Sequence, residues 1–320
     1  MITSSDLSGL MAMMPAFATD DAADIHATNT VSLDRLEKGL NSMIGDGADI
    51  ISTTGSFGEF HTLLPDEFET ITRAATEINN RRVPMFVGVT SLNTRETLQK
   101  MRIVAETKAA GVLVGVPFYF PSSPENAIRF YRDIAAEFPK LGIMIYHNPP
   151  LHNVKLTLSV MQEIMKIPNV VAMKDSHREP VEFMRLAQMA KGRMTVVVNQ
   201  LQYAMFHQTG ARAFWSIDSW YGPWPLLALR DAVARGDMAR ATEITLDIAP
   251  PVGAKPKSLS WRETAAKIGI RYAGYVDPGP LRSPFVEIPA DVDAEQKAKA
   301  IKWKALCEKY RKDVAIPAQA

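Results

Sequence analysis

The chain has 320 residues, of which 47% are hydrophobic, and a formal net charge of +1. This balance excludes a strongly basic protein that binds nucleic acid or an anionic membrane surface, and it provides enough apolar side chains for a large core. The single cysteine, Cys307, excludes an internal disulfide and is typical of a reducing compartment.

The apolar stretch at residues 9–18 has some features of a secretory signal sequence. No Lys or Arg precedes it, Asp6 lies just before it, and Pro15 interrupts it, so we do not predict export. No apolar run reaches the ~18 residues that a membrane-spanning helix needs. We therefore expect a cytoplasmic protein that neither enters a membrane nor binds nucleic acid.

Short apolar runs alternate with longer amphipathic stretches along most of the chain. In one such stretch, Phe68, Ile71, Ala75 and Ile78 keep the spacing of a single helical face. The apolar runs, each predicted to be a strand, are residues 10–14, 49–53, 85–89, 112–116, 142–146, 170–174, 194–198 and 212–217.

This alternation of strands and helices predicts an α/β protein with a parallel sheet and right-handed crossovers. Eight strand–helix units favour closure into a (β/α)₈ TIM barrel. An open doubly wound sheet is the alternative. The barrel is preferred because the count is eight and because no G-x-G-x-x-G pattern follows the first strand.

The alternation of apolar runs and amphipathic stretches ends after Asp247. The sequence Pro-Pro-Val-Gly at residues 250–253 interrupts the alternation, and helices are predicted at residues 258–272 and 294–310. We expect two parts: a barrel with the active site at residues 1–249, and a C-terminal helical extension packed on it at residues 250–320.

Polar side chains follow several predicted strands at the carboxyl end, where barrel enzymes place their active sites. After the second strand comes Gly-Ser-Phe-Gly-Glu, residues 55–59, a turn whose backbone N–H groups and Ser56 hydroxyl suit a carboxylate. Tyr146 ends the fifth strand and would be able to relay protons. A plain turn and a rim aromatic are the alternatives for these two features.

Lys174 ends the sixth predicted strand, directly after the apolar residues 170–173. Burial at such a position disfavours the ammonium form, so the amine would be partly neutral and nucleophilic near neutral pH. A solvent-facing lysine at the start of a loop is the alternative. The convergence of Lys174, Tyr146 and Ser56 on one end of the barrel favours an active site.

These three segments together resemble the N-acetylneuraminate lyase and dihydrodipicolinate synthase superfamily. Its members share a G-[ST]-x-G-E turn after strand two, a Y-x-x-P motif after strand five and a Schiff-base lysine at the end of strand six. Here these stand at residues 55–59, at residues 146–149 and at Lys174. The resemblance covers most of the chain.

Other segments resemble the hydratase-aldolases of aromatic catabolism within that superfamily. They include Thr-Ser-Leu-Asn-Thr-Arg-Glu at residues 90–96 and Gly-Pro-Leu-Arg-Ser-Pro-Phe at residues 279–285. The sequence departs from that pattern at residues 118–119, 175–177 and 261–262.

The resemblance implies a class I aldolase that cleaves a benzylidenepyruvate, an aryl-substituted unsaturated 2-oxo acid, to an aromatic aldehyde and pyruvate. Lys174 would form the imine, Tyr146 would shuttle the proton, and Asn148 would position water or the C4 oxygen. No cofactor or metal is implied, and the partners are a 2-oxo acid and an aldehyde, in a homotetramer. Substrate contacts are expected from Gly55, Ser56, Phe57, Phe118, Tyr119, Trp215 and Ser216.

Three alternatives remain open at this point. The first is a lyase or synthase of the same superfamily that acts on an aliphatic or sugar-derived 2-oxo acid. The second is a class II lyase with a divalent metal on Glu59, His147, Asp175 and His177. The third is a 2-oxo-acid sensor without catalytic activity on the same barrel.

Overall fold

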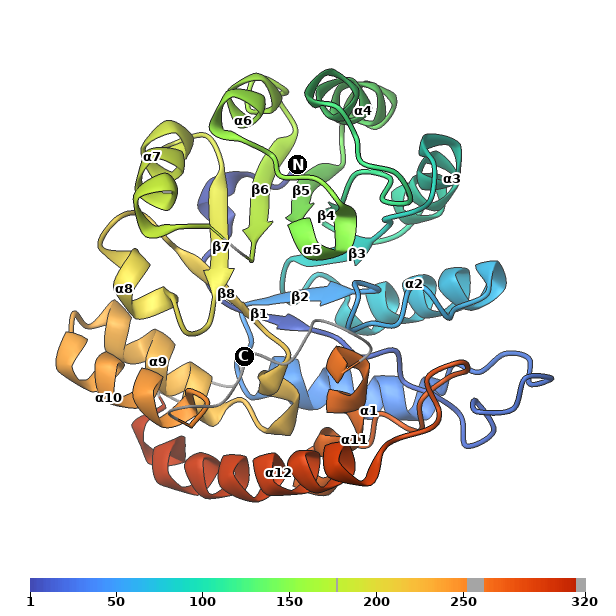
Figure 1. The fold of residues 1–320 in the computed structure, drawn as a ribbon, viewed down its shortest axis with the longest axis vertical. Coiled ribbons are helices and arrows are strands. Elements are labelled where there is room, and N and C mark those ends of the chain that lie inside the picture. Colours follow the sequence, from blue (N-terminus) through green and yellow to red (C-terminus); the bar gives the residue numbers. More distant parts are fainter. Residues whose placement is uncertain (177, 252–261, 315–320) are drawn as a thin grey trace.

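The computed structural model describes residues 1–176, 178–251 and 262–314 of the chain. Eight parallel strands form one closed barrel in sequence order, so the predicted (β/α)₈ barrel is confirmed (Figure 1). Each predicted run overlaps one strand, with ends that differ by no more than two residues. The strands are β1 Gly9–Met13, β2 Ile50–Thr53, β3 Met85–Gly88, β4 Gly111–Val114, β5 Gly142–His147, β6 Val170–Asp175, β7 Thr195–Asn199 and β8 Ala213–Ser216.

The strands are apolar because both of their faces are covered. Every residue of β1 to β6 is buried, with the barrel interior on one face and the surrounding helices on the other. Residues 9–13 of the apolar N-terminal stretch are themselves β1. Among the described residues, no helix is both long enough and apolar enough to cross a bilayer.

Several of the helices begin at a side-chain cap, and the amphipathic helices bury one face. Ser123 accepts a hydrogen bond from the Asn126 backbone N–H, 3.2 Å away, at the start of α4. In α2, Phe68, Ile71 and Ala75 are buried as their spacing predicts. The helices around the barrel are α1 Leu33–Gly45, α2 Pro65–Asn79, α3 Thr94–Ala105, α4 Pro124–Glu137, α5 Pro149–His152, α6 Leu158–Ile164, α7 Pro180–Ala190, α8 Tyr203–His207, α9 Trp224–Ala234 and α10 Met238–Ile248, with short 3₁₀ turns η1 Ser4–Asp6 and η2 Asp218–Tyr221.

Two further helices, α11 Arg262–Ala273 and α12 Ala290–Tyr310, form the predicted C-terminal extension, followed by η3 Arg311–Asp313. In Figure 1, α12 runs along the outside of the layer that contains α9 and α11. The Tyr221 hydroxyl of η2 lies 3.0 Å from the Ala266 carbonyl of α11 and 2.9 Å from Gln296 of α12. These bonds fasten the extension to the barrel, while the division at residues 249/250 stays a prediction.

The second predicted C-terminal helix differs from the observed one at its start. Helix α12 begins at Ala290, four residues before the predicted start, because Pro289 occupies the N-cap and Asp291 and Asp293 favour the first turn. Residues 258–261 of the other predicted helix lie outside the described residues.

Candidate active site

Lys174 and Tyr146 lie side by side at the carboxyl ends of β6 and β5, where they are register partners. The Lys174 Nζ lies 4.5 Å from the centroid of the Tyr146 ring and 3.7 Å from that of Trp215. It also donates a hydrogen bond to Ser176 Oγ at 3.2 Å. Lys174 and Tyr146 are only 3% and 4% exposed. The amine is therefore enclosed between two aromatic rings, away from bulk water.

The turn after β2 brings Ser56 to the same place. Ser56 Oγ and Tyr146 Oη are 3.0 Å apart. The turn is closed by a hydrogen bond of 3.1 Å from the Glu59 N–H to the Ser56 carbonyl. A Cβ on Gly58 would lie 2.7 Å from the Thr54 backbone nitrogen, so the second glycine of the motif is required for this close approach.

Asn148 also lies near the tyrosine hydroxyl. Its Nδ2 lies 3.4 Å from Tyr146 Oη. Its Oδ1 is buried and accepts no hydrogen bond from the part of the chain that the structure describes. A buried amide oxygen without a donor is costly, so this atom is available to a substrate hydroxyl or to water.

Trp215 and Ser216 follow one another in β8 but have different surroundings. The Trp215 Nε1 lies 3.4 Å from the Asp175 carbonyl, which holds the indole ring against the amine of Lys174. The Ser216 hydroxyl donates to Gln200 and accepts from the Ser219 N–H at 3.2 Å. Trp215 therefore contacts the predicted nucleophile, whereas the Ser216 hydroxyl is engaged within the protein.

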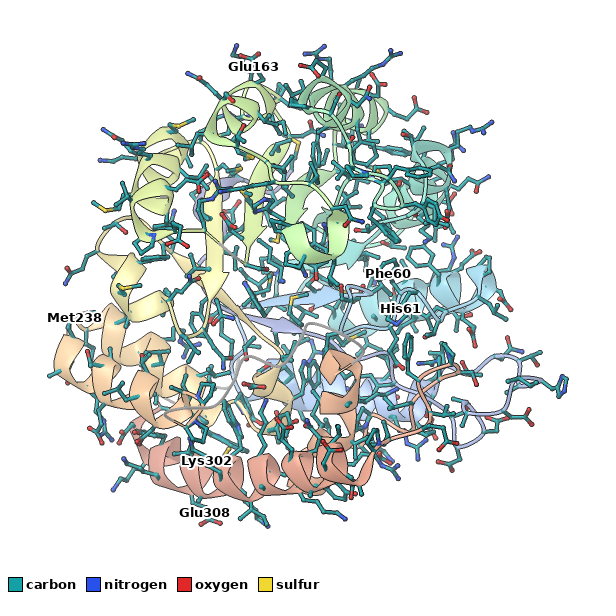
Figure 2. All side chains as sticks on the ribbon, in the orientation of Figure 1. Phe60, His61, Glu163, Met238, Lys302 and Glu308 are labelled. Atoms are coloured by element: carbon teal, nitrogen blue, oxygen red, sulfur yellow. The ribbon has the colours of Figure 1, made fainter. Side chains whose placement is uncertain are left out.

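The aromatic residues predicted to contact the substrate are placed at different depths. Phe57 is buried. Phe118 is half-buried, with its ring centroid 6.0 Å from that of Phe60. Tyr119 is 71% exposed on the surface. Phe60, which the sequence analysis did not single out, lies next to His61 beside α2 (Figure 2).

His152 is a site residue that the sequence analysis missed. Its ring packs edge-on against Tyr146, with 4.7 Å between centroids, and its Nδ1 lies 3.1 Å from the Tyr146 carbonyl. Burial, together with the nearby charge of Lys174, lowers the pKa of His152 to about 4. The neutral ring fits only because residue 115 is glycine, since a Cβ there would lie 2.4 Å from the imidazole.

A second missed feature is a buried ionic cluster behind the turn. Glu59 pairs with Lys267 of α11 at 2.6 Å and with Arg282 at 3.0 Å. Lys267 also donates to the Pro280 carbonyl at 2.8 Å. Burial lowers the pKa of Lys267 to about 8, although the Glu59 charge opposes the shift. The C-terminal extension thus holds the turn that carries Ser56.

Three of the four residues of the metal-site alternative are described, and each of these three is engaged with other side chains of the protein. Glu59 is bound to two cationic side chains, and Asp175 is bound to His147 and Arg178. His177 lies outside the described residues. In the ranges that are described, no group of three His, Cys, Asp or Glu side chains is placed to hold an ion.

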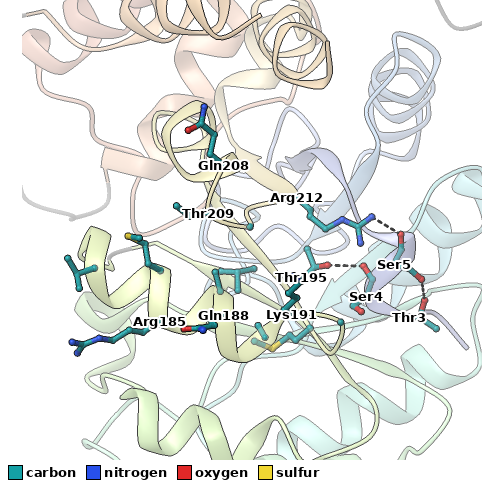
Figure 3. Close-up of a pocket in the computed structure, with 18 residues that line it drawn as sticks. Thr3, Ser4, Ser5, Arg185, Gln188, Lys191, Thr195, Gln208, Thr209 and Arg212 are labelled. Atoms are coloured by element: carbon teal, nitrogen blue, oxygen red, sulfur yellow. Dashed lines mark hydrogen bonds between the residues drawn. The ribbon is translucent and has the colours of Figure 1, made fainter. Parts of the chain in front are cut away.

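A groove of 960 Å³ lies at the opposite end of the barrel, between α7, α8 and the N-terminal residues (Figure 3). Thr195 and Arg212, near the starts of β7 and β8, donate to the carbonyls of Ser4 and Ser5 there. Because barrel chemistry takes place at the carboxyl ends of the strands, this groove is not the candidate site.

Comparisons with known proteins identify the family of the chain. The model of the dihydrodipicolinate synthetase family matches residues 13–303. The chain is 31% identical to a trans-O-hydroxybenzylidenepyruvate hydratase-aldolase of Pseudomonas putida, over 97% of each chain. It is 27% identical to a trans-2'-carboxybenzalpyruvate hydratase-aldolase of Nocardioides sp. (strain KP7), over 99% of this chain and 98% of the relative. The solved structure of PhdJ bound to a substrate intermediate superposes with a TM-score of 0.90 at 27% identity, over 97% of this chain and 99% of PhdJ.

Proposed function

The chain belongs to the dihydrodipicolinate synthetase family and is an enzyme of the aldolase kind, and from this premise we propose a class I hydratase-aldolase. Its substrate is a benzylidenepyruvate-type 2-oxo acid, and its products are an aromatic aldehyde and pyruvate. The relatives named above support this substrate class. The main support for the proposal is the position of the Lys174 amine. It lies between the rings of Tyr146 and Trp215, and the Tyr146 hydroxyl contacts Ser56.

Imine formation explains why a lysine stands at this position. Its Nζ attacks the C2 carbonyl carbon of the 2-oxo acid, and loss of water leaves a protonated imine. This cation draws electrons from the conjugated double bond, so that water adds at C4 and a neutral enamine forms. Protonation of the enamine at C3 restores the protonated imine. The restored cation then accepts the electron pair of the C3–C4 bond when that bond breaks and the aldehyde leaves, which gives a second enamine. Protonation at C3 and hydrolysis of the imine release pyruvate and restore Lys174.

The proton steps fall to the groups around the Tyr146 hydroxyl. Tyr146 takes the proton of the C4 hydroxyl as the C3–C4 bond breaks, and its own phenolic proton passes to C3 of the enamine that the cleavage leaves. Its oxygen contacts Ser56 and Asn148, and its ring lies against Lys174. The Asn148 Oδ1 accepts a hydrogen bond from the water that adds to C4, which satisfies its buried lone pairs.

Ser56 binds the C1 carboxylate of the 2-oxo acid together with backbone N–H groups of the same turn. We expect Ser56→Ala to raise KM by about tenfold or more, since a hydrogen bond to a charged group contributes about 1.5–3 kcal/mol. Steady-state kinetics measure the KM. Borohydride reduces the imine of Lys174 with pyruvate to a stable adduct, and the pyruvate concentration that gives half-maximal trapping in this way measures the same binding. An unchanged KM together with unchanged trapping would place the carboxylate elsewhere.

The aryl ring of the substrate packs against Phe118, which is half-buried above His152 with 6.4 Å between the two rings. We expect Phe118→Ala to lower kcat/KM for a benzylidenepyruvate by about tenfold, because aromatic contacts stabilise a bound ring. Trapping with pyruvate alone should not change, because pyruvate has no ring. Trp215→Ala should lower both quantities, because its ring touches the amine.

The exposed neighbour Phe120 is the matched control for Phe118, and Phe120→Ala should alter neither quantity. If Phe118→Ala reduces aryl turnover and pyruvate trapping equally, Phe118 supports the fold and does not select the substrate.

A panel assay tests the proposed function. The purified protein is offered pyruvate with aromatic and with aliphatic aldehydes, and the products are identified by mass. Higher kcat/KM with every aliphatic aldehyde would favour the alternative, a lyase for aliphatic or sugar-derived 2-oxo acids. Full activity after exhaustive chelation is expected of a metal-independent class I enzyme. The homotetramer and the cytoplasmic location stay predictions, which light scattering and cell fractionation would check.

A further inference from the structure

The residues that directly follow Tyr146 and Lys174 are also paired with each other. His147 and Asp175 are register partners on β5 and β6, one position beyond the catalytic pair. Successive side chains of a strand point to opposite faces, so this second pair points away from the site. His147 Nδ1 lies 2.9 Å from Asp175 Oδ1, and both side chains are buried. The two strands are thus joined by side chains at the level of the reacting groups.

The hydrogen bonds determine which nitrogen of His147 carries the proton. The backbone N–H of Leu156 donates to His147 Nε2 at 3.2 Å, so this nitrogen provides a lone pair. Nδ1 therefore carries the proton and donates it to the Asp175 carboxylate. The orientation of the ring is therefore set from both sides.

Arg178 completes the group. Its Nε donates to the second carboxylate oxygen of Asp175, its Nη2 donates to the Leu156 carbonyl at 3.2 Å, and its Nη1 donates to Glu182 at 2.9 Å. Burial by itself raises the pKa of Asp175, but the contacts with His147 and Arg178 outweigh it and lower the pKa to about 2. Asp175 therefore stays a carboxylate near neutral pH, with a hydrogen-bond donor on each of its two oxygens.

The same residue also reaches the reacting amine through its backbone. The Asp175 carbonyl accepts the hydrogen bond from Trp215 Nε1, and the indole ring of Trp215 lies against Lys174. A shift of the Asp175 side chain would therefore move β6 relative to β5 and change the position of Tyr146 against Lys174. Proton transfer is sensitive to such movements, since a displacement of about 1 Å can cost 10²-fold in rate.

We propose that His147, Asp175 and Arg178 form a clamp that positions Tyr146 against the imine of Lys174 for the proton-transfer steps. This inference rests on the proposed class I function and deepens it. The clamp residues touch no reacting atom, so they are positioning residues. The clamp acts after imine formation, because a flexible lysine can still reach a carbonyl carbon when the tyrosine is misplaced.

The test uses Asp175→Asn, which keeps the size of the side chain but removes the charge that binds Arg178. Each preparation is first treated with pyruvate and borohydride. The amount of adduct on Lys174 gives the number of sites that can form the imine. We expect kcat per trappable site to fall by roughly 10- to 100-fold, with KM changed by less than about threefold. A variant that is only less well folded would lose trappable sites while keeping wild-type turnover at each remaining site, and that result would overturn the proposal.

Lys155→Ala is the matched control. Lys155 ends the same chain of ion pairs at the surface, 3.0 Å from Glu182, and its loss should leave turnover per site unchanged. A loss equal to that of Asp175→Asn would show that any break in the ion-pair chain has the same effect, which contradicts a specific clamp.

A double-mutant cycle identifies the group through which the clamp acts. In the Tyr146→Phe background, Asp175→Asn should lower kcat by less than about threefold further, because the positioned hydroxyl is already gone. Fully additive losses would mean that Asp175 acts independently of Tyr146. If wild-type protein traps no pyruvate at all, the proposed function fails at that step, before the clamp is tested.

Discussion

Lys174→Ala is expected to reduce the formation of aldehyde and pyruvate to the limit of detection, a loss of roughly 10⁴-fold or more. Without the amine there is no imine, so the electrons of the C3–C4 bond have no acceptor. The measurement is product analysis by mass, combined with borohydride trapping. Wild-type protein should gain the mass of a reduced pyruvyl group on the peptide that contains Lys174, and the variant should gain none.

Lys174→Arg is the matched control for charge. It keeps a cation between Tyr146 and Trp215, but a guanidinium does not form an imine, so it should be as inactive as the alanine variant. Lys267 is the rival nucleophile, because burial lowers its pKa to about 8. An adduct found on Lys267, with activity kept in Lys174→Arg, would sink the mechanism.

Tyr146→Phe is expected to lower kcat by roughly 10²–10⁴-fold, the usual contribution of a positioned proton-transfer group. The substitution removes only the oxygen that contacts Ser56 and Asn148, while the ring stays against Lys174. Trapping with pyruvate should therefore remain measurable at Lys174. If turnover falls by this factor while trapping is unchanged, the hydroxyl acts in the proton transfer and not in imine formation.

Tyr131→Phe is the matched control for the loss of a buried tyrosine hydroxyl. The Tyr131 Oη donates to the Val114 carbonyl at 3.0 Å, away from the catalytic pair, so its removal should affect stability and not turnover. Near wild-type kcat in Tyr146→Phe would reduce Tyr146 to an aromatic wall of the site and assign the proton step to another group.

The barrel and the position of the predicted catalytic pair, Lys174 and Tyr146, could be predicted from local patterns. Apolar runs of strand length between helical stretches indicate strands covered on both faces, and eight of them close a barrel. Because parallel strands in a barrel all end at the same mouth, Ser56, Tyr146 and Lys174 could be expected to meet, and the structure brings them together. Their predicted roles in the reaction await the experiments above.

Only the tertiary structure decided how the catalytic groups are held. Lys267 meets Glu59 across 208 residues of sequence, and no periodicity or motif links a helix of the extension to the turn after β2. The departure from the hydratase-aldolase pattern at Asp175 is explained by its contacts with His147 of β5, with Arg178 between β6 and α7, and with Trp215 of β8. The physical reason is that local patterns reflect backbone geometry and solvent contact, which neighbouring residues share. The pairing of buried charges and rings depends instead on which distant side chains the closed barrel brings within a few ångströms.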